Sequence, residues 1–187
     1  MASDAPAYYM WSARTLRKTE LLRALLDADS ENARVNAALT LALLDTGGEK
    51  VIRILSASAL SRDGYIARAG RKYLAPRAIA AICALGRLAD PAALPALYAL
   101  TEDESFIDML PFEPYDFMAD RADYRFQYRS HIITALCAIA KVHPAYAGEI
   151  RDRLRRYDAG KTFDVTMMGP VLRYDDTQTL LGMIESL

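Results

Sequence analysis

The chain has 187 residues, of which 52% are hydrophobic and 25% are charged. This length and composition are typical of one globular domain with a buried core, and they exclude a wholly disordered chain. The formal net charge of -1 argues against a strongly basic nucleic-acid-binding protein and against an acidic tail.

The sequence also bears on the cellular compartment. Two cysteines, Cys83 and Cys137, are too few for a disulfide scaffold and favour a reducing environment. The first residues contain an early acid and no apolar run, unlike a secretory signal. The longest nearly unbroken apolar stretch, 132–140, is far shorter than a membrane span. We therefore expect a cytoplasmic protein with no membrane partner.

Apolar residues at helical spacing predict a series of helices along the chain. The first covers 12–28 and the last covers 176–187, while only 162–168 is compatible with a strand. Between them the helices come in pairs joined by short turns: 35–46 with 49–59, 78–89 with 91–100, and 132–143 with 145–157. The turns carry Gly47-Gly48, Asp90-Pro91 and His143-Pro144, as expected where one helix ends and another begins. The basic segment 62–74 joins the first two pairs.

The first helices of the three pairs align without gaps. Their frames begin at residues 35, 78 and 132, so the intervals are 43 and 54 residues. The second and third frames match at alanines, at the two cysteines and at a basic residue, while the first is a weaker copy. We expect the small residues at the shared positions to be buried between helices, namely Ala81, Cys83, Ala84, Ala135, Cys137 and Ala138.

The best copy, residues 76–97, resembles a HEAT repeat, especially the short form of the HEAT-like bilin-lyase-type proteins. It carries an arginine (Arg77), paired alanines, Leu85-Gly86 and Asp90-Pro91. The first copy keeps an arginine at the same position, whereas the third has His131 there. This resemblance covers about residues 30–157. It implies an all-α fold: one domain, 1–187, forming a short α–α superhelix of about three helix pairs plus terminal helices.

An acidic and aromatic insertion, 102–126, accounts for the longer second interval. Residues 102–124 contain eight acidic and one basic side chain. Long segments inside compact domains are uncommon and are often functional, and aromatic side chains are typical of interfaces. Two interpretations stay open, a structural strap and a recognition surface. In the second, the partner-binding residues are Phe106, Asp108, Phe112, Glu113, Tyr115, Asp116 and Phe117.

Motifs for catalysis are weak. Gly160-Lys161-Thr162 has Arg155 where a phosphate-binding loop needs glycine, and it follows a predicted helix. His131 is expected on a helix face and His143 at a helix C-terminus, without metal partners. The cysteines have no neighbouring base in the sequence.

Two arginine-rich clusters remain. They are expected to be solvated helix faces, although a groove for an anionic partner stays possible; their members are Arg68, Arg71, Lys72 and Arg77, and then Arg151, Arg153, Arg155 and Arg156.

The sequence therefore favours a non-enzymatic protein-binding or scaffold module. We expect another protein as partner, no cofactor and no nucleic acid, and we leave the oligomeric state open. The resemblance also implies two alternatives. One is a lyase-like or accessory enzyme acting on a bound cofactor or chromophore. The other is a detached auxiliary domain of a flavin-dependent oxidoreductase.

Overall fold

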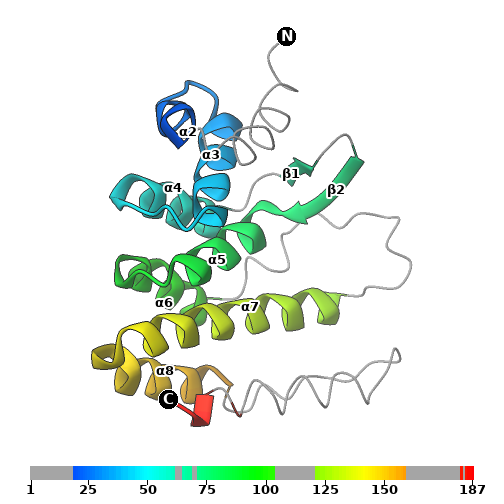
Figure 1. Ribbon diagram of the computed structural model, residues 1–187. Coiled ribbons are helices and arrows are strands. Elements are labelled where there is room, and N and C mark those ends of the chain that lie inside the picture. Colours follow the sequence, from blue (N-terminus) through cyan, green and yellow to red (C-terminus); the bar gives the residue numbers. More distant parts are fainter. Residues whose placement is uncertain (1–18, 62–64, 69–70, 104–120, 159–181, 183) are drawn as a thin grey trace.

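The computed structural model describes residues 19–61, 65–68, 71–103, 121–158, 182 and 184–187. These residues are mainly helical (Figure 1). The helices are α2 (Thr19–Leu25), α3 (Glu31–Leu43), α4 (Glu49–Leu60), α5 (Arg77–Leu88), α6 (Leu94–Glu102), α7 (Arg121–Val142) and α8 (Ala147–Asp158). Short 3-10 turns, η1 (Pro91–Ala93) and η3 (Pro144–Tyr146), lead into α6 and α8.

Local signals in the sequence explain where the helices begin. Ser30 caps α3 by accepting a hydrogen bond from the Ala33 amide at 3.4 Å. Asp90 accepts one from the Ala92 amide at 2.9 Å, directly before Pro91. Gly48 precedes α4 with φ of 137°, a backbone conformation that favours glycine. The short turns within the pairs therefore follow from residue type.

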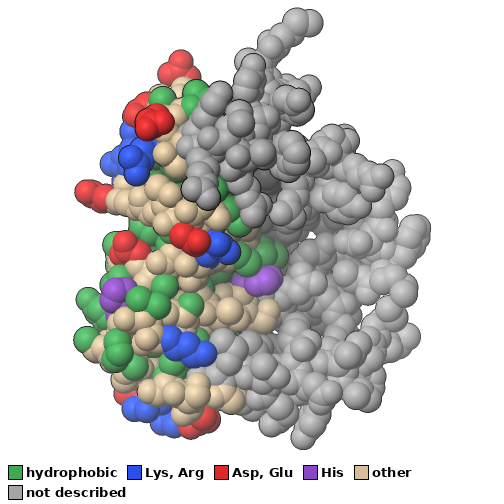
Figure 2. All heavy atoms as spheres, in the orientation of Figure 1, with side chains coloured by type: hydrophobic (Ala, Val, Ile, Leu, Met, Phe, Trp, Pro, Cys, Tyr) green, Lys and Arg blue, Asp and Glu red, His purple; other side chains and the backbone are tan. Residues whose placement is uncertain are grey.

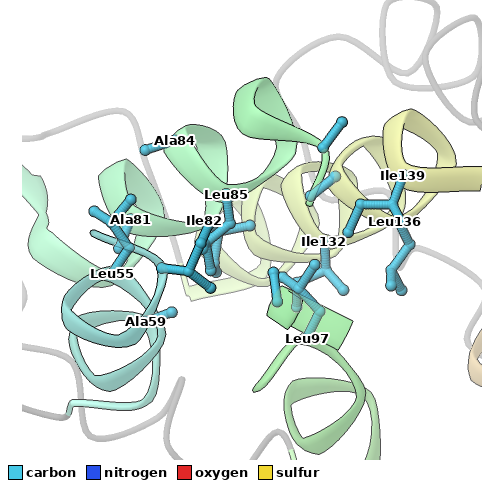
Figure 3. Close-up of a cluster of buried hydrophobic side chains, with 14 of the residues drawn as sticks. Leu55, Ala59, Ala81, Ile82, Ala84, Leu85, Leu97, Ile132, Leu136 and Ile139 are labelled. Atoms are coloured by element: carbon cyan, nitrogen blue, oxygen red, sulfur yellow. The ribbon is translucent and has the colours of Figure 1, made fainter. Parts of the chain in front are cut away.

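The helices pack in two rows. Helix α5 lies between α3 and α7, and α6 lies between α4 and α8 (Figure 1). The rows also touch each other, because α4 packs against α5 and α6 packs against α7. The core therefore forms between successive pairs, as the cluster around Ile82, Leu97 and Leu136 shows in Figure 3.

Most of the predicted helices are confirmed. The helix predicted at 49–59 ends one residue before α4 does, and the helix predicted at 78–89 is shifted by one residue from α5 at both ends. Helix α7 differs more, because it begins at Arg121 and so includes the last residues assigned to the insertion. Of the predicted terminal helices only parts are described, and 162–168 lies outside the described residues.

The segment between α4 and α5 was not predicted to contain strands. It forms a short antiparallel hairpin of β1 (Tyr65–Arg68) and β2 (Arg71–Pro76). Tyr65 is opposite Pro76, and Arg68 is opposite Arg71. The hairpin extends from the side of the molecule opposite the turns after α5 and α7 (Figure 1). The residues between the paired arginines, Ala-Gly, match the two-residue spacing of a tight hairpin.

The repeat frame also predicts burial, with one clear failure. Ala81, Ala84, Ala135 and Cys137 are buried, as expected. Ala138 is half-buried, and Cys83 is exposed. The two cysteines occupy equivalent positions, so the difference arises from what covers each helix and not from its own periodicity.

No helix in the described ranges is long and apolar enough to cross a membrane.

Candidate functional site

The residues predicted to bind a partner lie outside the described part of the chain. This holds for all seven: Phe106, Asp108, Phe112, Glu113, Tyr115, Asp116 and Phe117. The described residues nevertheless contain a polar feature at the junctions between helix pairs.

Each frame is preceded by a side chain that reaches back to an earlier element. We call this position the slot; it is filled by Arg34, Arg77 and His131. Arg34 donates to the backbone carbonyls of Ala28 and Asp29, at 2.7 and 2.9 Å, in the connection before α3. In the first unit, the side chain at the slot therefore contacts the segment that precedes its own helix.

Arg77 repeats this arrangement one unit later. From the start of α5 it donates to the Glu31 carboxylate at 2.5 Å and to the Asn32 side chain, both in the first turn of α3. The sequence placed Arg77 in a solvated basic cluster, and this is wrong: only 7% of the residue is exposed. Its planar guanidinium provides enough donors to bind two acceptors from the buried side of the junction.

His131 fills the slot in the third unit and contacts Cys83. The distance from its Nδ1 to the Cys83 Sγ is 3.3 Å. His131 is half-buried on α7, and Cys83 is exposed on α5. The sequence revealed no base near either cysteine, because these residues are 48 positions apart. The repeat alignment could have indicated this contact, because it places His131 at the position where Arg34 and Arg77 reach back toward the preceding unit.

The surroundings keep both groups of this pair neutral. Desolvation raises the pKa of the Cys83 thiol, with a backbone hydrogen bond opposing it, and desolvation lowers the pKa of His131. Both shifts favour the neutral thiol beside a neutral imidazole over the thiolate–imidazolium form, so the contact places a base beside the thiol without ionising it.

The backbones of α5 and α7, the helices that carry Cys83 and His131, pack closely together. A Cβ on Gly86 would lie 2.8 Å from the Ala135 Cα and 2.9 Å from its Cβ. Cys83 lies three residues before Gly86, and His131 lies four residues before Ala135. Since residues three or four apart share a helix face, the thiol and the imidazole meet one turn away from the closest contact.

Further charged contacts join neighbouring pairs. Arg87 on α5 binds Asp45 at 2.9 Å, after the end of α3. Arg153 on α8 binds Glu102 at 2.7 Å and lies over the Tyr98 ring, 4.1 Å from its centroid. Arg153 is thus tied to α6, whereas Arg155 and Arg156 are exposed as predicted.

The chain matches no protein-family model, and comparisons with curated proteins and with solved structures give no match either.

The turns present a second surface. We call it the turn edge; it comprises residues 43–48, 88–93 and 142–146. Figure 1 places the turns after α5 and α7 on the same side, and the Arg87–Asp45 pair brings the turn after α3 beside them. Leu43, Val142 and Tyr146 are exposed here, Val142 by 61%. On the side of the described residues seen in Figure 2, apolar side chains are mixed with charged ones.

Among the residues that the structure describes, no group of three or more His, Cys, Asp or Glu side chains is placed to hold a metal ion. His143 follows the end of α7, where its amide donates to the Ile139 carbonyl at 2.8 Å, in agreement with its predicted place.

Proposed function

We propose that this chain is a HEAT-like superhelix of about three helix pairs that binds another protein without catalysing a reaction. The observation that carries the proposal is the backward reach of the slot residues, Arg34, Arg77 and His131. A side chain that repeats its position and its direction in each unit supports a repeat architecture.

A repeat architecture favours binding through an extended surface. Each unit buries its apolar stripe against its neighbours and leaves its ends in solvent. The turn edge supports this function, because three apolar side chains from two different turns are exposed there: Leu43, Val142 and Tyr146. The acidic and aromatic insertion, 102–126, is a second candidate surface, and it differs from the turn edge in its high density of acidic residues.

Binding can be tested by crosslinking the tagged full-length chain in cells and identifying the linked proteins. The strongest candidate is then produced separately and its affinity is measured by calorimetry. We expect a complex of fixed stoichiometry. A purified chain that carries a stoichiometric chromophore or flavin, and binds no protein, would contradict the proposal and favour an accessory enzyme.

Charge-reversed variants locate the binding surface. Replacing Asp108, Glu113 and Asp116 by lysine should weaken binding, and more strongly at low salt than at high salt. The matched control reverses three exposed acids elsewhere, Glu20, Asp29 and Glu49, with the same change in net charge. If affinity at low ionic strength survives the first change, the insertion is not the binding surface.

The turn edge needs its own variant. Val142→Glu places a charge on its most exposed apolar residue, and Leu60→Glu, at the end of α4, is a control at an exposed apolar residue outside the turn edge. Loss of binding for Val142→Glu alone would assign the partner to the turn edge.

A further inference from the structure

The equivalent cysteines of the second and third frames differ sharply in accessibility. Cys83 is exposed, whereas Cys137 is fully buried, with 0% exposure. Burial raises the pKa of both thiols, that of Cys137 to about 11, so accessibility and a neighbouring imidazole, not a lowered pKa, distinguish Cys83 from Cys137. Any reagent that modifies the folded chain at a cysteine should therefore reach Cys83 alone.

Cys83 also has a base within reach. The Nδ1 of His131 lies 3.3 Å from its sulfur, on the neighbouring helix α7. The close packing of Gly86 on Ala135, one turn further along both helices, fixes this distance. The thiol and the base are therefore held by the core rather than by loops.

The position of the pair limits the chemistry. Both residues lie inside helices, where backbone amides are already bonded to carbonyls of the same helix. Acyl transfer needs free donors for an oxyanion, and these helix interiors do not offer them. Exchange with a disulfide needs only an accessible thiol and a route for its proton.

We propose that Cys83 is a modification site for small-molecule disulfides, with His131 as the proton acceptor. The thiol proton passes to Nδ1 while the sulfur attacks one sulfur of the disulfide. The disulfide bond breaks, a new mixed disulfide forms at Cys83, and the leaving thiolate takes the proton from the imidazolium. The small disulfide is reduced by the same two electrons that oxidise the Cys83 thiol, so no other oxidant is needed.

Because Cys137 is buried, the chain has no second accessible thiol that could remove the mixed disulfide from Cys83. Release of the mixed disulfide within the chain would need a second accessible thiol, and Cys137 is enclosed by the core. Removal therefore depends on an external thiol, which makes the site reversible. The added group would lie at the junction of α5 and α7, on the surface of the helix stack.

The proposal can be tested on the folded full-length chain with 5,5′-dithiobis(2-nitrobenzoate), whose released thiolate is followed by absorbance. We expect one thiol to react, none in Cys83→Ser, and an unchanged rate in Cys137→Ser. His131→Gln, which keeps a polar side chain but removes the base, should slow the reaction on the order of tenfold or more. Mass spectrometry after treatment with oxidised glutathione should find the adduct on Cys83.

A cysteine without an imidazole neighbour provides the matched control. Ala57 is exposed on α4, so Ala57→Cys in the Cys83→Ser background presents a thiol on a helix surface. Cys83 should react faster than this thiol in the wild-type chain and more slowly in His131→Gln. Thermal melts confirm that each variant is folded. Equal rates for the wild type and folded His131→Gln, or a wild-type rate no faster than that of Ala57→Cys, would overturn the proposal.

Discussion

The junctions of α5 with α3 and with α7 use the same repeat position in different ways. Toward α3, the slot holds Arg77, which binds two polar side chains of the neighbouring helix. Toward α7, the slot holds His131, which contacts the Cys83 thiol. The second junction also has the close contact between Gly86 and Ala135. Repeat position thus sets the direction of a contact, while residue type decides whether it is an ion pair or a contact between a thiol and an imidazole.

The largest expected effect tests the close contact at the second junction. Gly86→Ala should lower the free energy of unfolding by about 1–3 kcal/mol, because the new methyl group meets Ala135 backbone that cannot move independently. Urea denaturation measures the change. In the control Gly148→Ala, where an added Cβ has no atom within 4 Å, helix propensity should leave stability unchanged or raise it by up to about 1 kcal/mol. Equal effects would show that α5 and α7 are not closely packed.

The next prediction concerns the buried Cys137 thiol at alkaline pH. Burial raises the folded-state pKa of Cys137 from 9.0 to about 11, against a smaller opposing effect of Lys141. The neutral thiol therefore contributes stability that is fully present below the unfolded-state pKa and is lost as pH rises through the folded-state value. Between about pH 8 and about pH 10.5 the loss should be roughly 1–2 kcal/mol.

This loss is measured in the Cys83→Ser background, by comparing Cys137 with Cys137→Ala in urea denaturation at both pH values. The alanine variant should lose less stability over the interval, whatever its starting value. Parallel curves would mean that the Cys137 thiol is solvated in the folded chain.

The smallest expected changes in stability concern the two arginines at the junction of α5 with α3, Arg77 and Arg87. Arg77→Met should cost about 1 kcal/mol, because Glu31 and Asn32 lose the largely buried guanidinium that donates to them. Arg87→Met should cost a few tenths of a kcal/mol, since that pair with Asp45 is exposed on both sides. Thermal melts at low and high salt should show that the Arg87 effect fades with salt proportionally more than the Arg77 effect, because the Arg77 side chain is buried. The reverse order would make the outer pair, and not the slot, the main polar contact of this junction.

The sequence predicted the helices well because their apolar stripes and turn residues are local. Ala81 and Ala135 are buried as the frame requires, and Asp90 caps the turn before α6. Burial of Cys83 was predicted wrongly, because exposure on a helix flank depends on which neighbouring element covers it. The Cys83–His131 pair could not be read from spacing, since it depends on the lateral stacking of α5 on α7.

The connections between helices differ in length in a regular way. Within pairs they are short, as after α5, where Ala89 and Asp90 lead directly into η1. Between pairs they are long, with the hairpin separating α4 from α5 and residues 103–120 separating α6 from α7. Doubling the length of a flexible loop costs only about 0.6 kcal/mol in closure entropy. The chain can therefore gain or lose residues between pairs at little thermodynamic cost, so new surface can arise there while the contacts that order the helices stay unchanged.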